Sequence, residues 1–165
     1  MACMGTWAIE PASIDGAGVE EAIWEYAIEV SRRVWGRPAT DAELRKAIAD
    51  DPHADLAPPH GVFLVARGEE EEILGYVGVR FVPNQPATAE VKRMYVRPAG
   101  RGSGLGRGLL LAAEEAARGL GAVRMVMETN TQLTEARAMY TAFGYEETAP
   151  YNDHGAADHW YTKVL

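Results

Sequence analysis

The segment with the clearest capacity to bind an anion is RPAGRGSGLGRGLL, residues 97–110, which holds five glycines and three arginines. It follows the strand-like run EVKRMYV and precedes an apolar helical pattern, so it lies at the start of a helix. Unpaired backbone N–H groups and the positive end of the helix dipole attract phosphate at such a position. The alternating glycines let the backbone approach phosphate oxygens, and Arg101 and Arg107 can add charge-assisted contacts. The segment therefore predicts a phosphate or pyrophosphate site.

Two common phosphate-binding motifs do not fit this segment. A P-loop requires lysine and then serine or threonine after its last glycine, whereas Gly106 is followed by Arg107 and Gly108. The dinucleotide fingerprint G-x-G-x-x-G would have Leu105, Arg107 or Leu109 as its last glycine, depending on where it starts. A plain flexible connection between strand and helix is the alternative interpretation.

The elements that must position this segment follow from the spacing of apolar residues. Helical spacing predicts helices over 19–35, 41–49, about 104–120 and 134–142. Strands are predicted over 6–10, 62–67, 73–82, 90–96, 122–128, 145–149 and 159–165. Thr40 with Glu43 forms a capping-box pattern at the second helix, and four glutamates at 69–72 predict a solvated hairpin tip. Strands with helices inserted between them imply a mixed sheet flanked by helices.

Composition indicates one ordinary globular domain, residues 1–165, with 47% hydrophobic and 24% charged residues. The net charge of −8 disfavours a nucleic-acid partner and suits a cationic substrate better. No signal-peptide pattern and no stretch of 18 apolar residues occurs, so no membrane association is expected. The single cysteine, Cys3, cannot form an internal disulfide, and a cytoplasmic location is expected.

The run Arg101-Gly102-Ser103-Gly104-Leu105-Gly106, after the strand exit Val96-Arg97-Pro98, resembles the central signature of the GCN5-related N-acetyltransferase (GNAT) superfamily. That signature is a strand, then Arg/Gln-x-x-Gly-x-Gly/Ala, then a helix. The resemblance covers roughly residues 6–165 and includes the strand at 122–128, which ends in METN, and AMYTAFGY near the last helix. It implies an α/β (α+β) acyl-CoA N-acyltransferase fold, with a mixed, mostly antiparallel sheet of about seven strands and about four helices.

The resemblance also implies where acetyl-CoA, the expected co-substrate, binds. The strand at 90–96 has no cleanly apolar face, and a bulge would reset its alternation and leave backbone N–H groups unpaired. An ordinary edge strand is the alternative. In the family, this strand pairs with the pantetheine arm and the glycine-rich loop holds the pyrophosphate. Asn130 is a candidate partner of a pantetheine amide, and a helix cap is the alternative for it. The expected cofactor-binding residues are Met94, Tyr95, Val96, Arg101, Gly102, Ser103, Gly104, Leu105, Gly106, Arg107 and Asn130.

Amide formation from a thioester and an amine needs two proton transfers. A lysine-like amine, with a pKa of about 10.4, is protonated at neutral pH, so a base must accept its proton. By resemblance Glu90 is that base, assisted by burial or a water relay; pairing with Lys92 or Arg93 is the structural alternative. The departing thiolate needs an acid, and Tyr140, four residues before Gly144, stands at the family's tyrosine position. A core aromatic is the alternative for Tyr140.

The implied function is direct transfer of an acetyl group from acetyl-CoA to a primary amine of a small molecule or protein. A covalent acyl-enzyme is not expected, because Cys3 has no recognisable base beside it. A catalytically silent CoA-binding regulatory or interaction module is the alternative, and a longer donor such as succinyl-CoA stays open. A homodimer, frequent in the family, also stays open.

The acceptor amine is expected between the N-terminal helices, the loop at 50–61 and the tail loop near Tyr151. The acidic composition favours polyamines, aminoglycoside-like amines or protein lysines. Amino acids would fit equally if Arg33, Arg37 or Arg80 lined the pocket.

Histidines occur as two pairs that invite a metal hypothesis. His53 and His60 are seven residues apart, and His154 and His159 are five apart. These spacings match no common ligand template and no cysteine pair accompanies them, so no metal is expected.

Overall fold

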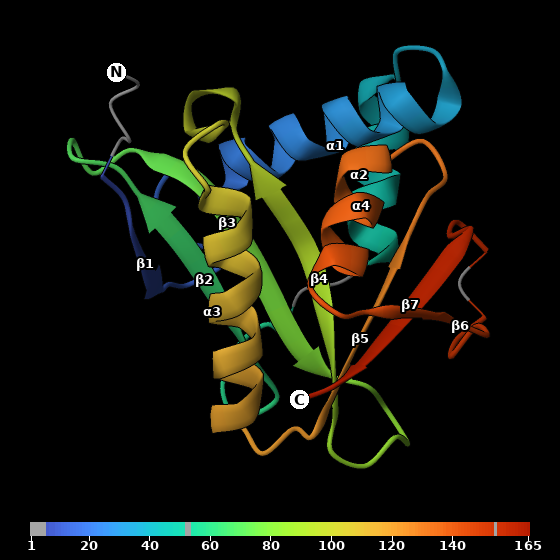
Figure 1. The fold of residues 1–165 in the computed structure, drawn as a ribbon. Helices are drawn as coiled ribbons and strands as arrows, with labels where there is room; N and C mark the ends of the chain where they lie inside the picture. Colours follow the sequence, from blue (N-terminus) through green and yellow to red (C-terminus); the bar gives the residue numbers. More distant parts are fainter. Residues whose placement is uncertain (1–5, 52–53, 154) are drawn as a thin grey trace.

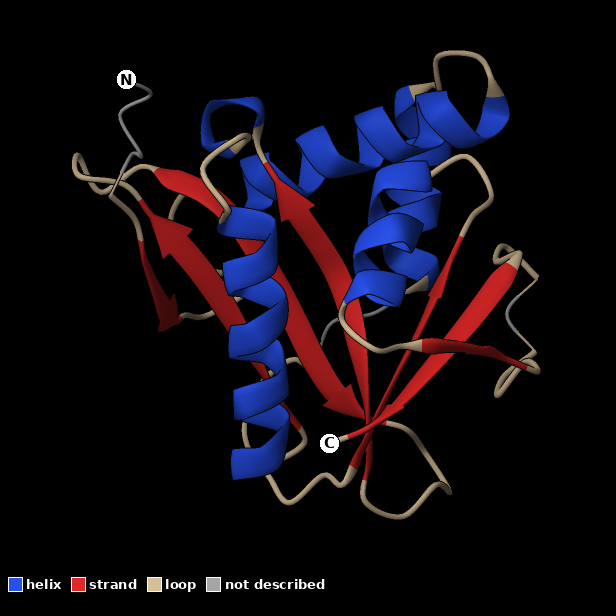
Figure 2. Cartoon of the chain, in the orientation of Figure 1, coloured by secondary structure: helices blue, strands red, loops and turns tan. Residues whose placement is uncertain are grey.

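The computed structural model describes residues 6–51, 54–153 and 155–165, which form one seven-stranded sheet with helices on both faces (Figure 1, Figure 2). The strands are β1 (Ala8–Pro11), β2 (Gly61–Arg67), β3 (Ile73–Phe81), β4 (Thr88–Val96), β5 (Arg124–Thr129), β6 (Glu146–Thr148) and β7 (His159–Val164). The helices are α1 (Val19–Trp35), α2 (Asp41–Asp50), α3 (Leu105–Gly119) and α4 (Thr134–Ala142), with a 3₁₀ turn at Pro98–Gly100. The predicted elements are confirmed, with boundaries shifted by up to two residues.

The sheet has the order β1-β2-β3-β4-β5-β7-β6. Every neighbouring pair of strands is antiparallel except β4 and β5, which are parallel. Helix α3 is the crossover between these two strands, as a parallel connection requires. The predicted mixed, mostly antiparallel sheet is therefore confirmed.

Two apolar cores lie on the two faces of the sheet. Along β2, Leu64 and Ala66 face the core shared with α3 and α4, whereas Phe63 and Val65 face the core shared with α1. This alternation follows from the two-residue period of a strand, and it explains why β2 is apolar at successive positions. The sheet thus separates an α1–α2 side from an α3–α4 side.

The hairpin between β2 and β3 has the predicted solvated tip. Gly68 donates its backbone N–H to Glu72, and the backbone N–H of Glu71 returns to Gly68. The four glutamates at 69–72 are exposed. Their repulsion is screened by water, which is why the acidic run is tolerated there.

Helix α2 begins with the predicted capping box. The Thr40 hydroxyl accepts the Glu43 backbone N–H, and the Glu43 carboxylate accepts the Thr40 backbone N–H. Arg37 donates two further bonds to the same carboxylate, at 3.0 and 2.7 Å. Together these hydrogen bonds lower the pKa of the Glu43 carboxyl to about 2, and Arg37 makes the largest contribution.

We expect Glu43→Gln to lower the thermal unfolding temperature at neutral pH but not at very low pH. Because the pKa of this carboxyl is lower in the folded than in the unfolded chain, its stabilisation is complete above the ordinary value of 4.5 and disappears as pH falls towards about 2. Calorimetric unfolding of both proteins between pH 7 and pH 2 measures this convergence. A constant difference across that range would contradict it.

Strand β4 contains the predicted bulge. Tyr95 pairs with Tyr76 of β3, while Lys92 pairs with Gly78, so Arg93 and Met94 both lie opposite a single residue. Arg93 adopts a positive φ of 54°, which is unusual for a residue other than glycine. The bulge resets the alternation, so Tyr95 packs into the α1-side core although Val91, four residues earlier, packs into the other.

Strands β4 and β5 are joined only near one end. Thr88–Glu90 pairs with Arg124–Val126, and within the described chain no further residue of β4 has a partner on this side. The two strands diverge beyond that point, and α4 lies near the opening (Figure 1). Backbone groups of β4 after Glu90 therefore face the opening with no strand beside them.

Candidate active site

The glycine-rich loop lies at the N-terminus of α3, as predicted. Gly102 and Gly104 both have positive φ, 79° and 78°, and a Cβ at either position would meet nothing within 4 Å. The helix has no side-chain cap and no acidic residue in its first turn. Open backbone N–H groups at an uncapped helix start form an anion site, so this loop fits a pyrophosphate.

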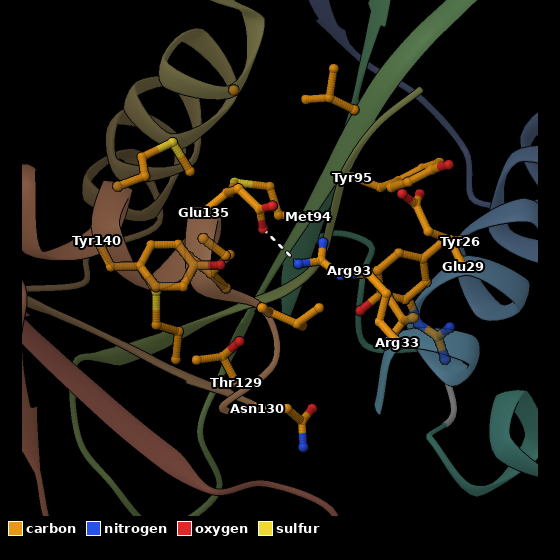
Figure 3. Close-up of a pocket in the computed structure, with 18 of the residues that line it drawn as sticks. Tyr26, Glu29, Arg33, Arg93, Met94, Tyr95, Thr129, Asn130, Glu135 and Tyr140 are labelled. Carbon is orange, nitrogen blue, oxygen red and sulfur yellow. Dashed lines mark hydrogen bonds and ion pairs between the residues drawn. The ribbon is translucent and has the colours of Figure 1, made fainter. Parts of the chain in front are cut away.

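A cavity of about 410 Å³ lies in the opening between β4 and β5 (Figure 3). We call it the donor cavity. Its walls come from α1, the end of β4, the start of α3, β5 and α4. The residues predicted for this region that line it are Met94, Tyr95, Val96, Arg101, Gly106, Asn130 and Tyr140.

A second cavity of about 400 Å³, here called the acceptor cavity, lies on the α1–α2 side of the sheet. It is lined by α1, α2, β4, β5 and the loop before β7. The two cavities share seven lining residues: Tyr26, Val30, Val91, Arg93, Glu128, Thr129 and Asn130. A molecule in one cavity can therefore meet a molecule in the other at the point where β4 and β5 separate.

Several predicted cofactor residues do not line the donor cavity. They are Gly102, Ser103, Gly104, Leu105 and Arg107, which lie next to it in the loop and the first turn of α3. The Ser103 hydroxyl donates to the Gly100 carbonyl at 2.6 Å, and the Arg107 guanidinium lies 5.3 Å from the centre of the Phe143 ring. The Leu105 side chain is buried in the core, so its backbone N–H is the group left to bind a ligand.

Tyr140 lies on α4 with its hydroxyl directed into the donor cavity (Figure 3). Its ring packs against Tyr145 and Tyr161, with centroids 6.1 and 5.8 Å away. Burial, with smaller contributions from Tyr26 and Tyr161, raises the pKa of Tyr140 well above its ordinary value. The phenol thus stays protonated at neutral pH and can donate a proton, while its ring also belongs to the core.

Glu90 is buried and lines neither cavity. Its carboxylate accepts a hydrogen bond from Arg80 at 3.2 Å and another from the Tyr151 hydroxyl. Burial and the nearby Glu90 charge raise the pKa of Tyr151 far above its ordinary value. These contacts support the alternative interpretation of Glu90, in which it forms a structural ion pair. Its partner is Arg80 rather than Lys92 or Arg93.

Glu128 is the carboxylate that lies where the two cavities meet, and it was not predicted as a catalytic candidate. Its side chain is 10% exposed, and it accepts a hydrogen bond from Asn152 at 3.0 Å. Lys92 lies 3.8 Å away. The sequence signal was its place in METN, at the end of a predicted strand, next to Asn130.

Asp51 forms the other acidic group at the base of the acceptor cavity. Its carboxylate lies 3.1 Å from Lys92, 3.5 Å from Arg80 and 3.8 Å from Arg93. Burial raises the pKa of Asp51, but the three cations together outweigh burial and hold it below its ordinary value. Asp51 is therefore an anion that neutralises buried cations.

Two ion pairs cross the rim of the donor cavity from α1. Glu29 holds the Arg101 guanidinium through both carboxylate oxygens, at 2.9 and 2.8 Å. Arg33 reaches Glu135 of α4 at 2.7 Å, the pair drawn as a dashed line in Figure 3. Asn130 donates its amide to the Ala156 carbonyl, so it holds the loop before β7.

The arginines considered as carboxylate receptors are already paired. Arg33 lines the donor cavity, Arg37 binds Glu43, and Arg80 binds Glu90. None of the three lines the acceptor cavity.

The structure describes one histidine of each pair, His60 and His159. Among the described residues, no group of three or more His, Cys, Asp or Glu side chains could hold a metal ion. His159 instead contacts Glu147 and Thr131. Cys3, His53 and His154 lie outside the described residues. Among the helices of the described residues, none has the length and apolar character needed to cross a membrane.

Comparisons with known proteins agree with this geometry. The model of the acetyltransferase (GNAT) family matches residues 19–145. An uncharacterised N-acetyltransferase of Schizosaccharomyces pombe is 40% identical over 101 residues, and the match spans 61% of each chain. A GNAT-family acetyltransferase from Staphylococcus aureus superposes with a TM-score of 0.75 at 15% identity, over 97% of this chain and 99% of that one. A PaiA N-acetyltransferase from Thermoplasma acidophilum, solved with coenzyme A, gives a TM-score of 0.66 at 18% identity, over 97% and 99%.

Proposed function

The chain belongs to the acetyltransferase (GNAT) family, and from this premise we propose that it transfers an acetyl group from acetyl-CoA directly to a primary amine. The observation that carries the proposal is the meeting of two cavities where β4 and β5 separate. A two-substrate transfer needs both reactants held within reach of each other, and this geometry supplies that arrangement.

The described residues fit acetyl-CoA on the donor side. The loop glycines, with no atom near the position of a Cβ, leave backbone N–H groups accessible to the pyrophosphate. The open side of β4 at Met94–Val96 supports pairing with the pantetheine arm, and Asn130 lies within the same cavity. Acetyl-CoA supplies the thioester whose acetyl carbon is attacked by the amine.

Proton transfers are assigned to residues near the junction. Tyr140 would donate the proton that the departing thiolate takes up, because its hydroxyl faces the donor cavity and is protonated at neutral pH. The position of Glu128 supports it as the acceptor of the amine proton, directly or through water. The assignment of this role to Glu90 stays a prediction, in which Tyr151 would relay the proton.

A thiol-release assay with acetyl-CoA and a panel of primary amines tests the proposed activity. We expect turnover that depends on the amine and acetylated amine as the product, detected by mass spectrometry. Calorimetric binding of coenzyme A without any turnover would instead support the silent CoA-binding module. Running the same panel with succinyl-CoA tests the choice of acyl group.

We expect Glu29→Gln to tighten coenzyme A binding about 2- to 5-fold, the range for an exposed ion pair. The substitution removes the carboxylate that holds Arg101 and a negative charge at the donor cavity. Calorimetric Kd values at low and high salt measure the effect, which should shrink with salt.

Glu25→Gln is the matched control. It removes the same charge one helical turn earlier, where Glu25 pairs with Arg97 and does not line the donor cavity. An equal gain in affinity for coenzyme A in both variants, or weaker binding in Glu29→Gln, would contradict a specific effect of the ion pair between Glu29 and Arg101.

A further inference from the structure

The acceptor cavity has an apolar outer wall. Trp35 at the end of α1 is 44% exposed and lines it, together with Ile48 and Ala47 of α2. Ala156 and Ala157, from the loop before β7, complete this wall. The Arg37 guanidinium lies 5.3 Å from the centre of the Trp35 ring. The rest of the exposed indole and the small apolar side chains beside it form a surface that gains from covering by an apolar group.

The base of the cavity carries two cations and two anions that compensate one another. Lys92 lies 3.1 Å from Asp51 and 3.8 Å from Glu128, and Arg93 also contacts Asp51. The side chains of Lys92 and Arg93 are 9% and 7% exposed, so their charges depend on these partners rather than on water. Among the described residues at the base of the cavity, the two positive and two negative charges therefore balance.

The remaining carboxylate of the wall is neutralised as well. Asp50 pairs with Lys46 at 2.5 Å, so each carboxylate among the described lining residues has a cation beside it. A second ammonium on the acceptor would have to compete with these existing cations. A carboxylate on the acceptor would meet Asp51 and Glu128 beside Arg93, and it would gain little net attraction.

We infer that the acceptor is a small primary monoamine whose amino group is attached to an uncharged apolar body, aromatic or aliphatic. This inference rests on the proposed function. The amino group reaches Glu128 at the junction of the cavities, and the apolar body lies against Trp35 and Ile48. Selectivity comes from the cost of placing a second charge on the apolar wall.

Three amines with six carbons each separate the alternatives: hexylamine, 1,6-diaminohexane and 6-aminohexanoate. They share the reacting primary amine, and the carbon at the far end is a methyl, a methylene that carries an ammonium, or a carboxylate. We expect kcat/KM for hexylamine to exceed that of each charged analogue at least 10-fold. Calorimetric titration of the three into the protein with coenzyme A bound should give the same order of affinity.

The titration measures affinity without turnover, so it tests the specificity of the acceptor cavity separately from the proposed activity. Absence of turnover with every amine, alongside the expected order of affinity, would overturn the activity and leave the specificity of the cavity standing. Equal or better kcat/KM and affinity for either charged analogue would overturn the inference and leave the activity standing.

Matched substitutions locate the selectivity in this wall. Ala47→Glu adds a carboxylate inside the cavity and should raise kcat/KM for 1,6-diaminohexane at least 5-fold relative to hexylamine. Ala49→Glu makes the same change at an exposed position of α2 outside the cavity, and the ratio should stay as in the wild type. A shift of the same size in both variants would assign the effect to overall charge and overturn the inference.

Trp35 should contribute to binding of the acceptor only through its contact with the apolar body of the amine. Trp35→Ala should raise KM for hexylamine about 10-fold with kcat nearly unchanged, and Trp35→Phe should restore most of the loss. Leu111→Ala, which removes an exposed apolar side chain of α3 outside both cavities, should leave KM unchanged. An unchanged KM in Trp35→Ala would place the acceptor elsewhere and overturn the inference.

Discussion

Replacing Tyr140 by phenylalanine is expected to lower kcat by a factor of about 100 to 10,000, the range for loss of a general acid. The substitution removes the hydroxyl that faces the donor cavity and keeps the ring that packs against Tyr145 and Tyr161. Because the pKa of Tyr140 is raised, the wild-type phenol is protonated across the pH range of the assay. The Kd of coenzyme A should change less than about 3-fold, because the Tyr140 hydroxyl interacts with the thiolate only as the thiolate departs.

Tyr145→Phe is the control for this substitution. Tyr145 belongs to the same aromatic cluster, but its hydroxyl donates to Glu114 at 2.9 Å and it lines neither cavity. We expect it to lower the free energy of unfolding by about 1 kcal/mol, the net value of a hydrogen bond, with kcat nearly unchanged. Retained kcat in Tyr140→Phe, or an equal loss in both variants, would refute the assignment of the acid.

Glu128→Gln is expected to lower kcat/KM by a factor of about 100 to 10,000 at neutral pH, because an amide cannot accept the proton of the amine. The substitution preserves the shape of the side chain and an oxygen for Asn152. Steady-state kinetics of the wild type and the variant at neutral pH, with the same amine, measure the effect.

Glu90→Gln provides the comparison that separates the two carboxylates. Glu90 is buried with Arg80 and Tyr151, so the substitution should lower the free energy of unfolding by about 1–3 kcal/mol. Its kcat/KM should stay within a few-fold of the wild type. The reverse result, a large loss of rate in Glu90→Gln and a small one in Glu128→Gln, would assign the base to Glu90.

Local patterns in the sequence were sufficient for most of the fold. The helix at Val19–Trp35 was predicted with the boundaries found, because its apolar period is long and Gly18 and Gly36 flank it. The capping box and the bulge were predicted from a few adjacent residues, since both depend on local hydrogen bonding and alternation.

The site was predictable where one short run of residues builds it or where the family resemblance marks a position, as for Asn130 and Tyr140. The glycine-rich loop is one short run, whereas the choice between Glu90 and Glu128 depends on how β4, β5 and the tail come together. Tyr151 reaches Glu90 across 61 residues of chain, and Arg101 reaches Glu29 across 72. Such contacts depend on tertiary packing. The spacing of apolar residues and the secondary-structure propensities of the sequence do not predict them.

The short parallel pairing of β4 with β5 also affects how the sheet can deform. Past Glu90, no backbone ladder joins β4 to β5, and the ion pair of Arg33 with Glu135 links α1 to α4 across the rim of the donor cavity. A small pivot of one half against the other would break no interstrand hydrogen bond on that side. Resistance to such a pivot must therefore come from side-chain contacts across the opening, and a molecule that fills the donor cavity would add to them.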